Sequence, residues 1–272
     1  MKKLATAVLA LVLFAATHAA ASTITYANTS SGQFGTLNLA TGAFTSVGNT
    51  PTVLSGIAAT PTGSVYGLDA SNNLVLINPA NANTTIVGNA GVSLVVFAGL
   101  TNGDLYGLDF NNNLYSINSA TGAASLVGAT GLPPIPADSG FANGLAGGAS
   151  TLYLSYQIYN TASHGPFGPS FYSLNPATGA PTLIGPAAQD TTGLGFVDGV
   201  LYGPARVGGV FDLVSINQNT GAASVIAPLS GVNGFVYGIA APQPVPEPTT
   251  LCLLGSGLAF AIRRRKRNRG IG

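Results

Sequence analysis

The stretch Asp104–Gly128 reads DLYGLDFNNNLYSINSATGAASLVG, and its pattern determines the fold expected for most of the chain. Apolar residues alternate with small or polar ones in short runs, and each run ends at a turn rich in Asn, Gly or Thr. Alternation of this kind is typical of β-strands, and the interruptions are typical of tight turns. Together with the preceding FAGLT at 97–101, the stretch predicts four short strands in about 40 residues, the size of one propeller blade.

The same unit recurs along the chain, at first with a strict period of 40 residues. The marks in register are Tyr26, Tyr66 and Tyr106, then Asn38, Asn78 and Asn118, then Gly48, Gly88 and Gly128. Two later copies drift but keep the pattern, within 151–185 and 200–227. Five copies predict an all-β fold, a β-propeller of five four-stranded blades. An open β-solenoid is the alternative, and six blades are expected if the insertion at Ile158–Ser170 contains a further strand.

The first copy lacks the strand that precedes the tyrosine in later copies. In the second copy that strand is Gly56–Ala59, with the sequence GIAA, and GIAA recurs at Gly238–Ala241. We therefore expect the C-terminal segment to supply the first strand of the first blade. Such an exchange closes the ring and removes the open edges that an unclosed array would expose. The repeat domain then spans residues 22–241.

The unit NLYSINSATGAASLVG at 113–128 resembles the L-Y-x-I-N-P-A-T-G-A repeats of many bacterial surface proteins whose repeats are expected to form propellers. This resemblance covers the whole repeat domain. Because the shared residues are turn and core residues, it implies the fold and no specific function.

The N-terminus, residues 1–21, has the features of a secretory signal peptide. Lys2 and Lys3 precede an apolar run at 4–16, and Ala19 and Ala21 provide the small residues that signal peptidase reads. Cleavage is expected before Ser22. An uncleaved membrane helix is the alternative, but it needs about 20 apolar residues.

The C-terminus has three parts in a fixed order. A proline-rich linker at 242–248 contains Val245, Pro246, Glu247 and Pro248, and an uncharged apolar segment follows at 249–262. A basic tail completes the anchor at 249–272, with Arg263, Arg264, Arg265, Lys266 and Arg267. Basic residues at both ends are expected to stay cytoplasmic while the long middle of the chain crosses the membrane.

This order of parts resembles the PEP-CTERM sorting signal of Gram-negative bacteria. The resemblance implies an exported precursor, held transiently in the inner membrane by the C-terminal helix and processed by an exosortase. It also implies a final place at the cell surface or in the extracellular matrix, and a link to extracellular polysaccharide. An ordinary tail anchor that stays in the membrane is the alternative.

Charge and cysteine content exclude several classes of partner and chemistry. Between the two terminal segments the chain has Arg206 and seven aspartates, a net charge of −6. Nucleic-acid binding needs clustered Lys and Arg, so nucleic acid is not expected as a partner. Cys252, the only cysteine, lies in the apolar tail, so the repeat domain has no disulfide, and no lipobox surrounds it.

Two repeated turns are the weak candidates for a metal site. Asp109, Asn111 and Asn113 alternate as in the first half of an EF-hand loop, and Asp69 begins the equivalent turn. The bidentate glutamate of a calcium loop is missing, so Asx turns are the favoured interpretation. We predict no metal and no cofactor. His164, the only histidine after cleavage, has no G-x-S-x-G turn to work with.

Aromatic residues crowd the fourth copy and its insertion: Tyr153, Tyr156, Tyr159, Phe167, Phe171 and Tyr172. Sugar rings stack on aromatic faces, so this region is a candidate glycan or partner surface. Tyr153 and Tyr172 fall on core positions of the repeat, which leaves the other four as the expected contact residues.

These observations favour a non-enzymatic, exported binding or matrix protein. Its expected partners are the two processing peptidases and either extracellular polysaccharide or another surface protein. A polysaccharide lyase or hydrolase is one alternative, although glycoside cleavage generally needs two carboxylates about 5 to 10 Å apart and the acids here are few. A self-assembling structural protein is the other alternative.

Overall fold

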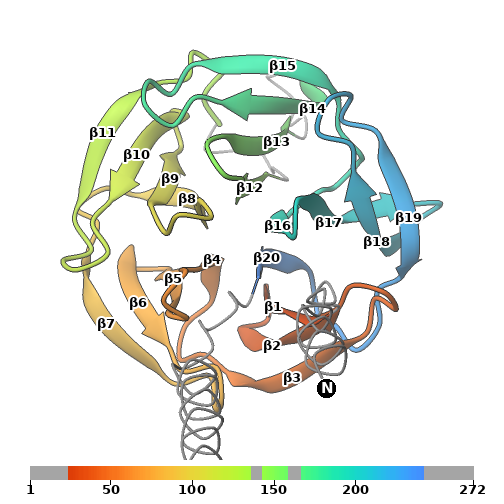
Figure 1. The fold of residues 1–272 in the computed structure, drawn as a ribbon, viewed down its shortest axis with the longest axis horizontal. Helices are drawn as coiled ribbons and strands as arrows, with labels where there is room; N and C mark the ends of the chain where they lie inside the picture. Colours follow the sequence, from red (N-terminus) through yellow and green to blue (C-terminus); the bar gives the residue numbers. More distant parts are fainter. Residues whose placement is uncertain (1–23, 136–142, 159–166, 242–272) are drawn as a thin grey trace, which may run out of the picture.

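The computed structural model describes residues 24–135, 143–158 and 167–241, and in this part of the chain 20 strands form five four-stranded sheets. Every strand pairing is antiparallel, and the sheets stand around a ring like blades (Figure 1). The expected signal peptide and C-terminal anchor lie outside the described residues. The described part contains no helix that is both long enough and apolar enough to cross a bilayer.

Each blade runs from an inner strand to an outer strand. Blade 1 consists of β20 (Val236–Ala240), β1 (Ile24–Thr29), β2 (Gln33–Asn38) and β3 (Phe44–Asn49). Blade 2 consists of β4 (Leu54–Ala59), β5 (Val65–Asp69), β6 (Asn73–Ile77) and β7 (Thr84–Asn89). Blade 3 consists of β8 (Leu94–Gly99), β9 (Leu105–Asp109), β10 (Asn113–Ile117) and β11 (Ala124–Ala129). Blade 4 consists of β12 (Gly144–Gly147), β13 (Leu152–Ile158), β14 (Phe167–Leu174) and β15 (Pro181–Pro186). Blade 5 consists of β16 (Gly195–Val197), β17 (Val200–Val207), β18 (Val210–Ile216) and β19 (Ala223–Pro228).

The prediction of a five-bladed propeller is confirmed. The insertion after Ile158 joins two paired strands of blade 4 and therefore adds no sixth blade. Contacts among the inner strands run around the whole ring, which rules out an open solenoid. The outer strands β3, β7, β11, β15 and β19 follow one another around the perimeter (Figure 1).

The predicted closing strand is also confirmed. β20 pairs antiparallel with β1, with Ala240 opposite Tyr26 and Ile239 opposite Ala27. The Thr25 hydroxyl, fully buried, donates a hydrogen bond of 2.6 Å to the Ala240 carbonyl. The last strand of the chain therefore completes the first blade, as the repeated GIAA indicates.

The core consists of five apolar clusters, and each cluster fills the space between two neighbouring blades. The cluster between blades 3 and 4 shows the pattern, with Leu108 and Leu114 from one side and Leu154 and Tyr156 from the other. Each blade is thus covered on both faces. This arrangement explains why successive residues, which point to opposite faces, are buried in middle strands such as β9 and β13.

The glycines at 40-residue spacing mark the contact points between blades. A Cβ on Gly88 in β7 would overlap with the carbonyl oxygen of Thr121, which lies in the β10–β11 turn of the next blade. A Cβ on Gly128 would likewise overlap with the carbonyl oxygen of Thr178, and one on Gly185 with that of Thr220. The outer strand of one blade therefore supports the turn of the next, and glycine is required because the two backbones touch.

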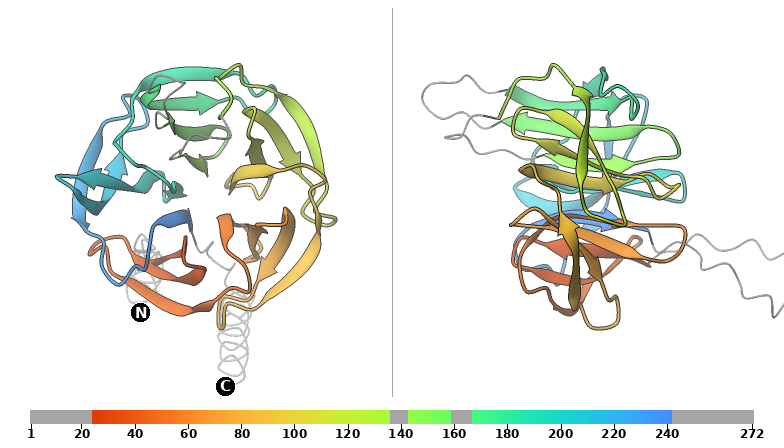
Figure 2. Two further views of the ribbon diagram at one scale, coloured as in Figure 1. Left: turned by 180° about the vertical axis from the view of Figure 1, so that it is seen from behind. Right: turned by 90° about the vertical axis from the view of Figure 1, so that its left-hand side faces the viewer.

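The ring has two different faces, seen edge-on in Figure 2. β20 ends and β1 begins on one side, which we call the terminal face. The opposite side, the loop face, carries the connections between the second and third strands of each blade. In blades 4 and 5 these second and third strands are seven or eight residues long, against five or six in blades 1 to 3.

Removal of Gly238–Ala241 tests the closing strand. Ile239 and Ala240 would leave buried positions and β1 would gain an open edge. We expect the free energy of unfolding of residues 22–237 to fall by about 3 kcal/mol or more relative to residues 22–241, as judged from the loss of a buried aliphatic side chain. Urea titration of the two proteins measures the difference. Equal midpoints would show that the ring does not depend on β20.

The contact at Gly88 provides a second test. Gly88→Ala is expected to destabilise the domain by about 1 to 3 kcal/mol, because the added methyl group forces two packed backbones apart. Gly168→Ala is the matched control, since nothing lies within 4 Å of a Cβ at that position. Thermal melting of both variants reports the effect. A Gly88 variant that melts with the wild type would contradict the proposed contact.

Candidate binding surface

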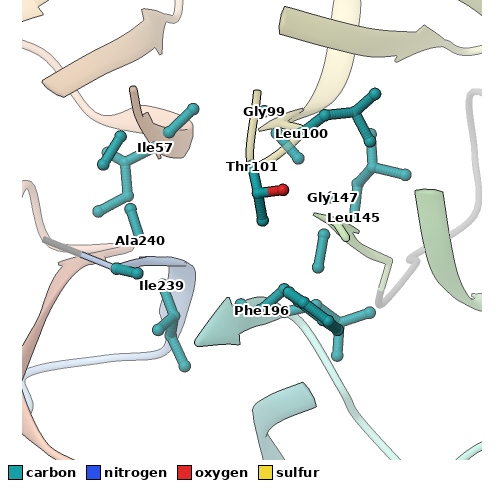
Figure 3. Close-up of a pocket in the computed structure, with 16 residues that line it drawn as sticks. Ile57, Gly99, Leu100, Thr101, Leu145, Gly147, Phe196, Ile239 and Ala240 are labelled. Carbon is teal, nitrogen blue, oxygen red and sulfur yellow. The ribbon is translucent and has the colours of Figure 1, made fainter. Parts of the chain in front are cut away.

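The central channel is narrow and apolar (Figure 3). Its walls come from the inner strands, with Ile57, Leu145, Phe196 and Ile239 among the lining residues, and none of the described residues in the lining is charged. The free volume is about 20 Å³, room for about one water molecule. The channel therefore works as part of the core, and a binding surface has to be sought on the outside of the ring.

The aspartates of the two repeated turns bond the turns themselves. Oδ1 of Asp109 accepts hydrogen bonds of 2.8 Å from the backbone N–H groups of Asn111 and Asn113, and Oδ2 accepts one of 2.9 Å from the Asn113 amide. Asp69 has the same three bonds in blade 2, with donors from Ser71 and Asn73. Both carboxylates therefore form Asx turns. In the described residues, no three His, Cys, Asp or Glu side chains gather in a way that would hold a metal ion.

The aromatic residues of blade 4 are mostly part of the core. Tyr153 stacks between Phe171 at 6.0 Å and Phe196 at 6.2 Å, ring centroid to centroid, and its hydroxyl donates to Oε1 of Gln218 at 2.9 Å. Phe171 and Tyr156 are fully buried, so the expectation that these two are free for a ligand is wrong. Blades 3 and 5 cover both faces of blade 4, and this covering cannot be seen in a single repeat.

Three of the aromatic and histidine candidates lie beyond what the structure describes. Tyr159 and His164 lie outside the described residues, and so does the side chain of Phe167. The glycan surface expected from them is therefore without structural support from these positions.

A polar cluster joins blades 4 and 5 on the loop face. Nε of Arg206, on the extended β17, donates to Oδ2 of Asp190 at 2.6 Å. The backbone N–H of Asp190 donates to Oε1 of Gln157 at 3.0 Å, and the N–H of Gln157 donates to Oδ1 of Asn143 at 3.0 Å. Asp190 is nearly buried, whereas 40% of the Arg206 side chain is exposed. We call these four residues the loop-face cluster.

Aromatic side chains lie beside Arg206. Its guanidinium carbon lies 4.9 Å from the ring centroid of Phe211, within the range of a cation–π contact. Phe211 in turn packs edge to face against Phe235 at 5.2 Å, and Phe235 is exposed. Val207 and Val210, at the tip of the β17–β18 hairpin, are exposed as well. The only cation of the repeat domain thus sits in an apolar, aromatic setting that can contact a ligand.

Sequence reasoning did not find this surface. The sequence pattern identifies Arg206 only by its charge, and no motif contains Asp190 or Phe235. One available indication was the alternating run VLYGPARVGGVFDLVSI at 200–216, which continues past the length of the other hairpins and turns on Gly208 and Gly209.

A second hollow lies on the outer part of blade 5, toward the terminal face. It has a volume of about 460 Å³ and is lined mainly by small and polar side chains, including Ser215, Asn217 and Gln218. Gln218 also donates to the Gly199 carbonyl at 2.7 Å while it accepts from Tyr153. The hollow is wide open and has no aromatic wall, so it is a weaker candidate than the loop face.

Comparison with known proteins bears first on the C-terminus. Residues 244–266 match the family described as the PEP-CTERM protein-sorting motif. The chain carries a PEP-CTERM sorting signal. The predicted sorting signal is thereby confirmed, and the match spans Val245–Pro248. The signal implies an exported, membrane-anchored precursor that an exosortase processes for the cell surface. No curated protein is similar enough to count as a match.

Solved structures match the propeller. One chain of the nidogen/laminin complex is 13% identical, with 80% of this chain and 97% of that chain covered and a TM-score of 0.48. The putative TolB of Agrobacterium tumefaciens is 15% identical, with coverages of 75% and 68% and a TM-score of 0.44. The hydrazine synthase of Kuenenia stuttgartiensis is 12% identical, with coverages of 76% and 63% and a TM-score of 0.42. Likeness at this level concerns the fold alone and carries no argument about function.

The buried tyrosines predict how stability depends on pH. Burial raises the pKa of the Tyr153 hydroxyl above its ordinary value of 10.0, so the unfolded chain loses this proton at lower pH than the folded one. Stability is therefore full below about pH 10 and falls as the pH rises further. Tyr153→Phe removes one such group. Between about pH 8 and 11, the melting temperature of the variant should fall less steeply than that of the wild type. Equal slopes would show that the Tyr153 hydroxyl does not contribute to the pH dependence.

Proposed function

We propose that the protein is an exported, non-catalytic propeller that binds extracellular polysaccharide through the loop face of blades 4 and 5. The observation that supports this most is the pair of extended hairpins in these two blades. The blade 5 hairpin carries Arg206 and Phe211, and Phe211 packs against Phe235, which directly precedes β20, so the three side chains lie together on the loop face. An aromatic edge beside hydrogen-bond donors is the chemistry by which sugar rings and hydroxyl groups are recognised.

The position of the sorting signal supports the choice of face. Ala241 follows β20 on the terminal face, and the sorting motif begins only three residues later, at 244. An anchored precursor therefore holds the terminal face toward the membrane. The loop face then points outward, where it can meet ligands before and after the anchor is removed.

The environment of the acidic residues supports a non-catalytic role. Asp69 and Asp109 bond their own turns, and Asp190 is paired with Arg206. The channel, where propeller enzymes can place a site, is narrow, and its lining residues are uncharged. Glycoside cleavage by paired carboxylates needs acids that face a substrate across a gap of about 5 to 10 Å. The enzyme alternative thus has no specific observation in its favour.

The test is a binding assay of residues 22–241, a unit that contains its own closing strand, on the host's extracellular polysaccharide. We expect saturable binding that is insensitive to EDTA and leaves the glycan at its original length. Phe235→Ala should weaken binding about ten-fold, the loss of a contact of about 1.4 kcal/mol. Arg206→Lys, which keeps the charge but not the planar stacking on Phe211, should weaken it as well.

Val47→Ala is the matched control, because Val47 is exposed on β3 at the perimeter, away from the loop-face cluster. Its binding should equal that of the wild type. Absence of binding would reject polysaccharide as the ligand, and shortened glycan would reject a non-catalytic role. Loss of binding with EDTA would show that a divalent cation takes part in the contact.

A further inference from the structure

The outer strands carry an exposed apolar residue at one repeated position. Ile86, Leu126, Leu183 and Val225 occupy it in blades 2 to 5, with exposures of 63, 62, 62 and 53%. Each lies beside a β-bulge and opposite the same position of the third strand, as Ile86 lies opposite Val75 and Leu126 opposite Tyr115. We call these four residues the perimeter belt. In blade 1 the equivalent residue is Ser46.

Packing within the ring does not account for the belt. The five core clusters lie between blades, and more than half of each belt side chain faces outward. The side chain varies among Ile, Leu and Val from blade to blade, yet it stays apolar in four copies. Single exposed apolar residues are ordinary, but here the same position is both apolar and exposed in four of the five blades.

Charge is distributed so that the perimeter is neutral. The outer strands read FTSVGN, TTIVGN, ASLVGA, PTLIGP and ASVIAP, and none contains a charged residue. The six described aspartates and Arg206 all lie on second or third strands or in connections. Two copies with a net charge of −6 each would bring carboxylates together if they met face to face. They avoid this repulsion if they meet side by side.

The outer strands are also the unpaired edges of their sheets. Proteins commonly protect such edges with lysine, and here lysine is absent. The bulges, together with Pro181, Pro186 and Pro228, limit continuous strand pairing and leave the side chains as the main points of contact. These features fit a partner that is itself neutral and apolar at the point of contact, and the perimeter of an identical copy has these properties.

We propose that the perimeter belt is a self-association surface on which copies of this chain pack side by side. Because four blades carry the belt, one copy can contact more than one neighbour, and the assembly is open rather than a closed dimer. Each contact is small and therefore weak, so association depends on the high local concentration of an exported surface protein. The belt is separate from the loop face, and the two proposals stand or fall independently.

Sedimentation equilibrium of residues 22–241 is the test, from about 0.02 to 1 mM, a range that covers weak association. The average mass of the wild type should rise with concentration and pass that of a dimer. A variant with Ile86, Leu126, Leu183 and Val225 all changed to Lys should remain a monomer. The control changes Val53, Val200, Val207 and Val210 to Lys, four exposed valines outside the outer strands, and should associate like the wild type.

The control variant has the same net charge as the belt variant, because each set of four lysines changes the net charge of residues 22–241 from −6 to −2. The net charge is the same in both variants, so loss of association in the belt variant alone depends on where the lysines lie and not on the net charge. Circular dichroism melts verify that both variants fold. Ser46→Leu gives a second test that does not depend on the lysine variants, because it adds the missing fifth position and should raise the average mass at each concentration.

Three results would overturn the proposal. One is a wild type that stays monomeric over the whole range. Another is equal dissociation of the belt and control variants, which would place the contact elsewhere. The third is a monomer that sediments with phosphatidylethanolamine and phosphatidylglycerol vesicles through the belt, which would identify a lipid surface as its partner.

Discussion

The pairing of β20 with β1 is the interaction on which the ring depends. Every other blade is formed from one continuous stretch of chain, but blade 1 exists only when the two ends of the domain meet. The five apolar clusters lie between blades, so each needs both of its neighbours in place. Loss of one pairing would therefore open two interfaces, on either side of blade 1. With no disulfide and few ion pairs available to it, the domain is stabilised by closure and by tight backbone contact at its glycines.

Much of the fold could be predicted because short sequence patterns determine its strands and turns, and these patterns recur in each repeat. The 40-residue spacing of Tyr66 and Tyr106 reflects the repeated strands, and the Asn, Gly and Thr residues reflect the turns between them. The second GIAA segment reflects the need to pair the open edge of blade 1. The Asx turns at Asp69 and Asp109 followed from the same local chemistry. The burial of Tyr156 and Phe171 did not, because it depends on what the neighbouring blades cover. The loop-face cluster escaped prediction for a similar reason: Gln157, Asp190 and Arg206 are far apart in sequence and meet only across an interface between blades.

The molecule separates its tasks in space. The channel is narrow and its lining residues are uncharged. The sorting signal follows the strand that ends on the terminal face. The largest departures from the repeat lie on the loop face of blades 4 and 5. Blades 1 to 3, which keep the strict period, carry few features beyond those that the ring needs. The binding surface proposed here thus lies where the repeat was modified, and the perimeter belt lies where it was kept.

The place of β20 in the chain also sets an order of events. A chain that crosses a membrane from its N-terminus presents β1, β2 and β3 first, and blade 1 must wait with an unpaired inner edge until some two hundred further residues have emerged. Blade 1 can therefore be completed only after β20 has emerged. The sorting signal follows the closing strand almost directly. Because the matched motif begins after Ala241, removal of the anchor leaves the closing strand in place.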